Sequence, residues 1–378
     1  LRADIENLLF EMLDQCQQIA NTPTELLSPQ VSDSIIGVGE RLSARIIAAL
    51  LRQNHVRGVA IEGTDVIVTD AVYGNAIPNL QRSRERLMQH IAPMLERKIV
   101  PVVTGFIGAT EDGIPTTLGR GGSDYTASVI SACLNATELW IWTNVDGMMS
   151  TDPNEIPSAR VIEKLTFDEV AELAYFGAHI LHARMIDPLR EQGIPFRIKN
   201  VFKPKQSGTL IQQERLTANA RLRAVTAIPA LSVTGNRSGG VLAVIDLVQQ
   251  AMAATTGQKP DVMLTTQSSD STALFFVIPT TAGGADAVEN VRTAVMARFS
   301  DFVDRVVWNV EPVVIVTAIG TGFAYTTTMQ AQILQNLTET RILGMAQGPS
   351  QCSYSVIVEE KDAEFVLRQI HNLVLNSG

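Results

Sequence analysis

The stretch that decides the fold is residues 117–125, with the sequence TLGRGGSDY. An apolar run at residues 99–104 precedes it and predicts a buried strand, whereas residues 124–134 have the apolar period of a helix. A glycine-rich connection between a strand and a helix places backbone N–H groups at the start of that helix. The stretch therefore predicts a site for a small anion.

The side chains of this stretch fit the same interpretation. Ser123 or Asp124 is suited to cap the helix, and Arg120 carries a planar guanidinium that matches a carboxylate or a phosphate. Three glycines allow a ligand to approach the backbone closely: Gly119, Gly121 and Gly122. A structural tight turn followed by a helix cap would use the same residue types, so the pattern alone leaves both readings open.

Apolar runs and helical periods alternate through the first half of the chain. The predicted strands are residues 56–61, 66–69, 99–104, 139–143 and 195–199. The predicted helices are residues 1–20, 42–51, 82–98, 124–134 and 167–176. Continuous apolar strands separated by helices are typical of a largely parallel sheet covered on both faces. We therefore predict an α/β fold for this half.

After residue 211 the sequence becomes richer in strands and contains a weak internal repeat. Residues 262–269 (VMLTTQSS) and 343–348 (LGMAQG) occupy equivalent places in two βαββα units. The helices of these units are predicted at residues 241–253, 285–299, 329–337 and 362–373. The repeat predicts two small α+β modules, with chance similarity of short strands as the alternative.

Composition excludes some classes of partner. The 378 residues carry a formal net charge of −9, so the net field repels nucleic acids and anionic membranes, and we expect neither as a partner. No apolar run approaches the roughly 20 residues of a membrane span. The three cysteines lie far apart without metal-ligand spacing, which favours reduced thiols and a cytoplasmic setting. The chain begins with Leu1 instead of Met, so we expect it to start within a longer gene product.

Residues 118–127 (LGRGGSDYTA) closely resemble the substrate loop of aspartate kinases, which are members of the amino acid kinase family. Upstream, residues 39–43 (GERLS) resemble that family's Gly-Glu-x-x-Ser. Further matching strings follow in the family's order: TGFIG at 104–108, IWTNVDG at 141–147, TDP at 151–153, YFGA at 175–178 and SGTL at 207–210. The resemblance covers nearly the whole chain.

This resemblance implies a domain organisation. Residues 1–215 would form a three-layer amino acid kinase domain, similar to carbamate kinase, with a mainly parallel sheet. Residues 216–378 would form two ferredoxin-like ACT modules, a regulatory α+β fold. The first module, about 229–305, would be inserted in the second, which comprises about 216–228 and 306–378. The string at 265–269 is most similar to threonine-sensitive kinases, including those fused to homoserine dehydrogenase.

The implied reaction is phosphorylation of the side-chain carboxylate of L-aspartate by ATP, with Mg²⁺, to give 4-phospho-L-aspartate. This is the first step of lysine, threonine and methionine biosynthesis. Because the attacking carboxylate is already ionised near neutral pH, the reaction needs no general base. Catalysis then consists of positioning two anions and neutralising their charge.

The resemblance also assigns site residues. It implies Arg120, Asp124 and His179 as catalytic residues, and no metal-ligating residue. The implied substrate-binding residues are Glu40, Ser43, Arg120, Gly121, Gly122 and Ser123. The implied ATP-binding residues are Thr143, Asn144, Met149, Asp152, Asn154, His179 and Ile180. The implied effector-binding residues are Gln267 and Gln347.

Each assignment has a plainer alternative. Glu40 would bind the substrate ammonium and Arg120 its α-carboxylate, so we expect both in one cleft; alternatively, Glu40 interacts only with the dipole of its helix. His179 has a purely structural alternative, and either glutamine could be an exposed turn residue.

Several positions depart from the family. No Lys-Phe-Gly-Gly strand precedes Glu40, so either the chain lacks its beginning or the first strand is lost. Asn144, Met149, Asn154 and His179 stand where the family has Asp, Tyr, Arg and Lys. The last two changes remove fixed positive charges beside a triphosphate, and a histidine replaces such a charge only while protonated. We therefore expect reduced activity, and the alternative function is an impaired kinase that acts as an amino-acid-binding regulatory subunit.

The resemblance finally implies partners. We expect a homodimer formed through the ACT modules and an amino-acid effector, threonine or lysine. Residues 321–325 and 348–350 depart from the family's usual effector loops, which predicts a weakened response.

Overall fold

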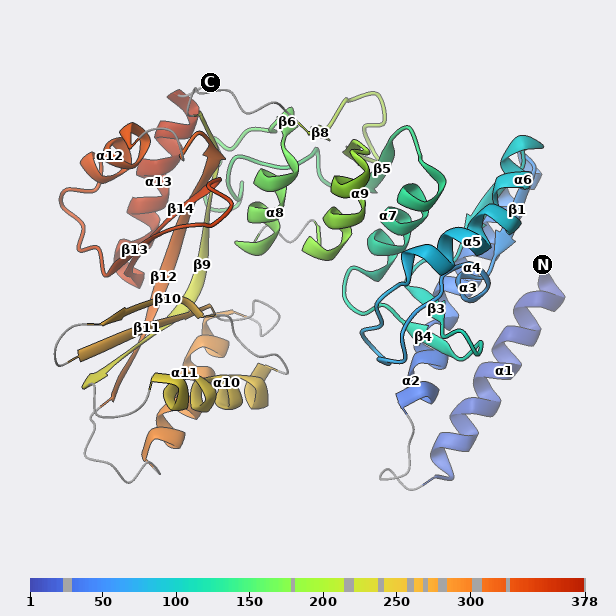
Figure 1. Ribbon diagram of the computed structural model, residues 1–378, viewed down its shortest axis with the longest axis horizontal. Coiled ribbons are helices and arrows are strands. Elements are labelled where there is room, and N and C mark those ends of the chain that lie inside the picture. Colours follow the sequence, from blue (N-terminus) through green and yellow to red (C-terminus); the bar gives the residue numbers. More distant parts are fainter. Residues whose placement is uncertain are drawn as a thin grey trace. The chain divides into compact units, whose positions relative to one another are not determined.

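The computed structural model describes residues 1–22, 29–177, 181–213, 221–236, 241–256, 262–267, 271–277, 284–300, 308–323 and 327–376. The chain divides into two compact units (Figure 1). The first unit comprises Leu1–Asp146 and His179–Gln213, and the second comprises Gly147–Ala178 and Glu214–Gly378. The segment 147–178 thus folds with the C-terminal part of the chain.

The first unit alternates helices and short strands. Its helices are α1 (Arg2–Ala20), α2 (Pro29–Ile36), α3 (Val38–Gln53), α4 (Gly63–Val66), α5 (Leu80–His90), α6 (Ala92–Glu96), α7 (Gly122–Leu134), the 3₁₀ turn η2 (Ala183–Met185) and α9 (Ile186–Gln192). Its strands are β1 (Gly58–Ile61), β2 (Val100–Val103), β3 (Ile107–Ala109), β4 (Pro115–Thr117), β5 (Leu139–Thr143), β7 (Phe196–Asn200) and β8 (Thr209–Ile211).

The strand pairs of this unit confirm the predicted α/β class. β1 pairs with β2 and β5 pairs with β7, both in parallel, whereas β3–β4 and β7–β8 are antiparallel. Among the described strands, β1–β2 and β3–β4 are two-stranded sheets, whereas β5, β7 and β8 lie in one sheet, so the unit does not have a single continuous sheet. Apolar side chains of α5 and α7 pack over residues 66–67 in a common core.

Two sequence-based elements of this unit were wrong. Residues 66–69 were predicted as a strand, but Gly63–Val66 is one helical turn, and only isolated bridges follow at Val68 and Thr69. Residues 82–98 were predicted as one helix, but α5 ends at His90 and α6 begins at Ala92. Pro93 lies in the first turn of α6, where its missing N–H is tolerated, and it cannot continue the ladder of α5.

The second unit is built on one six-stranded sheet with helices against it (Figure 1). The strands of this sheet are β9 (Arg221–Asn236), β10 (Val262–Gln267), β11 (Ser271–Val277), β12 (Trp308–Thr321), β13 (Gly344–Gln347) and β14 (Ser353–Glu359), whereas the short strand β6 (Lys164–Leu165) of this unit lies outside it. Its helices are α8 (Phe167–Tyr175), α10 (Val241–Thr256), α11 (Gly284–Ser300), α12 (Thr328–Gln335) and α13 (Glu360–Asn376). The sheet order is β10-β11-β9-β12-β14-β13.

Two long strands, β9 and β12, join the two halves of this sheet. They pair antiparallel from Arg221↔Thr321 to Gly235↔Trp308. β11 pairs with β9 only from Ala230 onward, and β14 pairs with β12 only from Val313 onward. Pro229 and Pro312 stand directly before these two starts, where the neighbouring strand requires no N–H from them.

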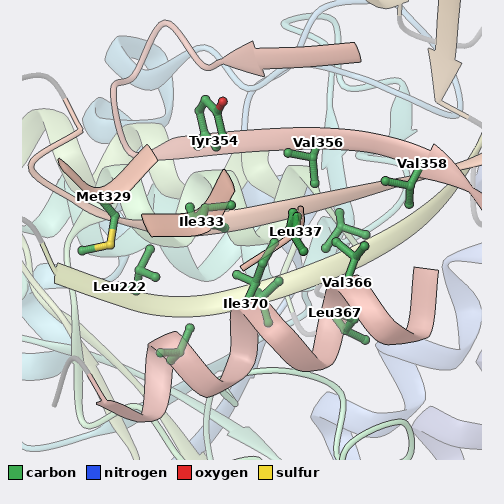
Figure 2. Packing of buried hydrophobic residues seen from close by; sticks show 14 of the residues in the cluster. Leu222, Met329, Ile333, Leu337, Tyr354, Val356, Val358, Val366, Leu367 and Ile370 are labelled. Atoms are coloured by element: carbon green, nitrogen blue, oxygen red, sulfur yellow. The ribbon is translucent and has the colours of Figure 1, made fainter. Parts of the chain in front are cut away.

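Each half of the sheet carries its own helices and core. α10 and α11 cover the half with β11, and α12 and α13 cover the half with β14. Figure 2 shows Val366, Leu367 and Ile370 of α13 directed toward Val356 and Val358 on β14. The two repeated α+β units predicted from the sequence are therefore observed, and β9 and β12 each extend through both of them.

The segment 147–178 is fastened to this sheet by buried polar contacts. The backbone N–H of Val225 on β9 donates to the carbonyl of Ser150 (2.8 Å). The hydroxyl of Ser150 lies 2.9 Å from Nε2 of His371 on α13, and that histidine is 1% exposed. Burial, with a smaller contribution from Arg160, lowers the pKa of His371.

None of the described helices is both long enough and apolar enough to cross a membrane.

The buried His371 predicts a pH-dependent stability. Its folded-state pKa lies below the ordinary value near 6.5, so as the pH falls below about 6.5 the unfolded chain takes up a proton before the folded chain does. The stability gained by burying neutral His371 is fully present above about pH 6.5 and decreases as the pH falls below it. Urea unfolding between pH 7.5 and 5 should show a weaker pH dependence in His371→Gln than in the unchanged protein. The exposed His90 gives the control His90→Gln, which should leave the dependence unchanged; equal slopes in all three proteins would contradict the prediction.

Candidate functional site

The loop between β4 and α7 has a backbone that only glycine adopts easily. Gly119 and Gly121 have φ values of 74° and 69°, in the left-handed region. A Cβ on Gly121 would lie 2.5 Å from Cβ of His182, so the loop and His182 are in direct contact. Gly121 is itself the N-cap of α7, and no side chain caps this helix. The predicted cap by Ser123 or Asp124 was therefore wrong, since both residues lie inside the first turn.

A cavity of about 630 Å³ opens at this loop. Its lining comes from α2, α3, the segment after β2, and the start of α7. The lining residues are Ile36, Gly39, Glu40, Ser43, Phe106, Gly119, Arg120, Gly121, Gly122, Ser123 and Asp124. All of the substrate-binding residues predicted from the sequence are among them.

Glu40 and Arg120 bring opposite charges to this cavity although they are 80 positions apart. The helix predicted at residues 42–51 is longer, because α3 begins at Val38, and Glu40 lies in its first turn. Gly37 N-caps this helix, and a Cβ there would lie 2.8 Å from the Ile107 side chain. A cavity that places the Glu40 carboxylate and the Arg120 guanidinium together is suited to a ligand that carries both an ammonium and a carboxylate.

Burial changes the ionisation of two groups at this site. Burial raises the pKa of the Asp124 carboxyl, which shifts it toward the protonated form. Burial lowers the pKa of His182, and the neighbouring cations Arg184 and Arg120 lower it further. His182 therefore favours its neutral form behind the loop.

The entry to the loop is fixed by a buried carboxylate that sequence reasoning missed. Asp33 on α2 is 3% exposed. Its Oδ2 accepts from the backbone N–H groups of Thr117 (2.8 Å) and Gly74 (2.9 Å), and its Oδ1 accepts from the Thr117 hydroxyl (3.0 Å). Asp33 thus joins three segments that are distant in sequence, and no local motif announces that role.

Phe106 was also missed as a lining residue. Its φ is 70°, an unusual conformation for a bulky side chain. Its N–H donates to the Thr126 hydroxyl (3.0 Å), and its carbonyl accepts from the N–H of Leu118 (2.9 Å). These contacts hold its position beside the loop, and a strained conformation of this kind is often found at functional sites.

A second polar group lies at the carboxyl ends of β5 and β7, where Thr143 and Asn144 are placed. The Asn200 amide donates to Asp146 (2.6 Å), and the Lys203 ammonium lies 2.6 Å from the other oxygen of Asp146. The hydrogen bond from Lys203, followed by that from Asn200, lowers the pKa of Asp146. Asp146 is therefore an ionised carboxylate next to a cation.

Asp146 is a candidate ligand for magnesium. Within the described ranges, no three His, Cys, Asp or Glu side chains gather in a way that could hold a metal ion. Mg²⁺ bound with a nucleotide needs only one or two carboxylates, because phosphates and water supply the other ligands. The ionised Asp146 fits that smaller requirement.

The remaining predicted nucleotide-binding residues are distributed differently. Met149, Asp152 and Asn154 belong to the second unit, where the Asn154 N–H and amide both donate to Oδ1 of Asp152 (2.8 and 3.0 Å). His179 and Ile180 lie outside the described residues.

The predicted effector residues end two edge strands. Gln267 is the last residue of β10 and Gln347 the last of β13, and both are exposed. The two edges meet, since a Cβ on Gly344 would lie 2.8 Å from the Leu264 side chain. The strands that end in Gln267 and Gln347, β10 and β13, are therefore in contact with each other.

Comparison of the sequence with known proteins identifies the family of the chain. Residues 5–200 match the amino acid kinase family, and the chain belongs to that family. Over 98% of its length it is 29% identical to the bifunctional aspartokinase/homoserine dehydrogenase 1 of Arabidopsis thaliana, and it covers 41% of that protein. It is 28% identical to aspartokinase 2 of Bacillus subtilis, covering 95% of the chain and 86% of that protein.

Solved structures give the same result. E. coli aspartokinase III in complex with lysine and aspartate is 28% identical, with a TM-score of 0.77, over 98% of the chain and 81% of that protein. The predicted resemblance to aspartate kinases is therefore confirmed. The chain spans about two fifths of the length of the bifunctional relatives it matches.

The three hydrogen bonds of Asp33 predict a stability effect. Asp33→Asn exchanges one acceptor oxygen for an NH₂ donor and removes the charge, so at least one of the three hydrogen bonds that Asp33 accepts is lost. We expect the free energy of unfolding to fall by about 1–3 kcal/mol, measured by urea denaturation. Asp14→Asn on the exposed part of α1 is the control and should change stability by less than about 0.5 kcal/mol. A loss in Asp33→Asn no larger than in the control would contradict this account of the loop.

Proposed function

We propose that the protein is an aspartate kinase, in which the side-chain carboxylate of L-aspartate attacks the γ-phosphorus of ATP and the bond to ADP breaks. The observation that carries this proposal is the cavity shared by Glu40 and Arg120. E. coli aspartokinase III in complex with aspartate and ADP supports the proposal, since it is 27% identical to this chain with a TM-score of 0.74. The products are 4-phospho-L-aspartate and ADP.

The charges of the cavity assign a role to each side of the substrate. Glu40 accepts hydrogen bonds from the ammonium group, and Arg120 binds the α-carboxylate through its planar fork. Ser43, Ser123 and the N–H group of Gly121 supply further polar contacts. Gly122, whose own N–H donates to the carbonyl of Gly119 (3.0 Å), leaves room for the substrate because it has no side chain. Two fixed opposite charges orient the amino acid in one direction only, so its side-chain carboxylate points away from this clamp.

The catalytic role of Asp124 follows from its place and its pKa. Its carboxyl lies in the first turn of α7, beside the proposed substrate. Because burial raises its pKa, it repels the anionic substrate less than an exposed aspartate would. In its protonated form it also supplies an O–H donor to a substrate oxygen.

The nucleotide is proposed to bind at the carboxyl ends of β5 and β7. Thr143 is the last residue of β5 and Asn144 follows it, and Lys203 provides a cation for phosphate oxygens beside Asp146. Mg²⁺ held between Asp146 and the phosphates would neutralise part of the triphosphate charge. By resemblance, the other proposed contacts are Met149, Asp152, Asn154, His179 and Ile180.

The domain roles are proposed as follows. Residues 1–215 form the catalytic domain, and residues 216–378 form tandem ACT modules, the first inserted in the second. Gln267 and Gln347, on two strands that touch, form the proposed effector site for threonine or lysine. The crystal structure of E. coli aspartokinase III with lysine supports an amino-acid effector. Exposed strand edges of the modules favour pairing of two chains.

A reducing, cytoplasmic setting is proposed from the thiols. Cys16, Cys133 and Cys352 are free. Burial raises the pKa of Cys133 to about 11 and that of Cys352 to about 12, so these two thiols stay protonated and chemically inert.

A second function is favoured by one observation, the altered nucleotide side. Asn144, Met149, Asn154 and His179 replace residues that the family uses near ATP. A protein that keeps the aspartate clamp but lacks these groups would bind amino acids without efficient phosphoryl transfer. Aspartate binding by calorimetry together with an absence of ADP formation would identify this second function.

The aspartate clamp predicts a selective kinetic effect. Arg120→Ala removes only the partner of the substrate carboxylate, so we expect KM for aspartate to rise on the order of tenfold or more, with KM for ATP changed less than about twofold. Glu40→Gln should have the same selectivity. The control Arg57→Ala, in an exposed part of the first unit, should leave both constants unchanged. Equal losses for aspartate and ATP in Arg120→Ala would refute the assignment.

The proposed effector site predicts ligand binding and assembly. Calorimetric titration should detect threonine or lysine at millimolar concentration, and Gln267→Ala or Gln347→Ala should weaken that binding. Sedimentation should give a homodimer at micromolar concentration. A monomer, or no heat with either amino acid, would leave the modules with a structural role only.

A further inference from the structure

Arg184 makes a set of contacts that the proposed reaction does not explain directly. It lies in η2, and its Nη1 donates to the carbonyl of Leu118 (3.0 Å) and to the side chain of Asn75 (2.5 Å). Its Nη2 donates to the carbonyl of Ala76 (3.1 Å). Its guanidinium carbon also lies 4.9 Å from the ring centroid of Tyr125.

These contacts enclose the substrate loop at both ends. Leu118 directly precedes the lining residues that begin at Gly119, and Tyr125 directly follows the last of them, Asp124. Arg184 itself is absent from the lining of the cavity. We propose that Arg184 is a positioning residue that holds the loop at residues 119–124 in its substrate-binding shape, a role that rests on the proposed function.

The loop requires such external support because of its glycines. Gly119, Gly121 and Gly122 restrict the backbone less than any other residue would, so the open chain has many conformations to lose. Two of the hydrogen bonds of Arg184 end on backbone carbonyls, at Leu118 and Ala76, which fixes the main chain itself. The N–H of Ala76 also donates to the carbonyl of Thr117 (2.9 Å), so residues 75–76 and 117–118 form one supported layer.

The side chain of Asn75 lies between Arg184 and Gly119. A Cβ on Gly119 would lie 2.8 Å from Oδ1 of Asn75, the same oxygen that accepts from Arg184. The side chain of Asn75 therefore fills the space beside Gly119 and is kept there by the guanidinium. Loss of that guanidinium frees the Asn75 amide and removes the wall of the loop at this point.

His182 completes the wall two residues before Arg184. Its ring nitrogen Nδ1 accepts from the backbone N–H of Arg184 (3.4 Å), and its Cβ is in contact distance of Gly121. The backbone of residues 182–184 is therefore coupled to the middle of the loop as well as to its ends. The proximity of Arg120 contributes to the lowered pKa of His182.

The planar geometry of arginine is essential to this role. One guanidinium reaches Leu118, Ala76 and Asn75 at the same time through two separate nitrogens. A lysine carries the same charge on a single nitrogen and cannot reproduce this fork. Arg184→Lys should therefore restore only part of what Arg184→Ala loses.

The test compares Arg184→Ala, Arg184→Lys and the control Arg57→Ala. Arg57 also donates to a backbone carbonyl, that of Arg97 (3.1 Å), but it lines no part of the cavity. We expect KM for aspartate to rise on the order of tenfold in Arg184→Ala, less in Arg184→Lys and not in the control, with KM for ATP unchanged in all three. Equal increases in both KM values, or none, in a folded variant would overturn the proposal.

A second measurement does not depend on activity. Hydrogen exchange of the amides at residues 118–125 should be faster on the order of tenfold in Arg184→Ala, with other parts of the first unit unchanged. If the unchanged protein shows no turnover, the proposed function fails while this exchange measurement still decides the role of Arg184. If Arg184→Ala does not fold, the same exchange measurement on Arg184→Lys decides it, and normal exchange at residues 118–125 overturns the proposal.

Discussion

The left-handed backbone at Gly119 and Gly121 is the constraint on which the first unit depends. It allows the chain to leave β4, pass close to His182 and enter α7 directly after Gly121. A β-carbon at Gly121 would move either the loop or His182. Glu40 and Arg120 share a cavity only because this turn is so tight. Asp33 holds the residues before the turn through hydrogen bonds to Thr117. The close packing of Gly121 against His182 holds the middle of the turn.

The second unit combines sequence regions that resemblance assigns to different tasks. Residues 147–178 contain Met149, Asp152 and Asn154, yet they are anchored to the sheet of the C-terminal modules. Glu169 on α8 is fully buried and faces Arg223 on β9 at 3.7 Å, while Ser150 bonds both β9 and α13. Removing one partner of such a buried pair is costly, so this segment follows the sheet. An effector bound to the sheet would influence these residues to the extent that it prefers one arrangement of the sheet over another.

Sequence reasoning found the elements with strong periodicity and the residues with a distinctive string. The helices at 1–20 and 124–134 and the strands at 139–143 and 195–199 are present within a residue or two of their predicted ends. Glu40, Ser43 and residues 120–124 all line one cavity. They could be predicted because most of them belong to one contiguous string, residues 118–127. Asp33 and Arg184 were missed because their partners are 84 and 66 positions away, and no local pattern records such contacts. The continuity of β9 through both units was not predicted, because Pro229 lies within it and no local pattern records which strands pair on each side.

The pairing of β9 with β12 has a consequence for how such a protein gains or loses parts. The chain leaves β9 at Asn236 and returns at Trp308, and Gly235 and Trp308 are paired across the ladder. The two ends of the intervening segment are therefore adjacent in space. A short turn between them would close β9 and β12 into a simple hairpin, with β12, β14, α12 and α13 retaining their mutual contacts. Evolution can thus add or remove the residues in between as a single segment, and its removal would uncover Leu231, Val233 and Val310, which pack against α10 and α11.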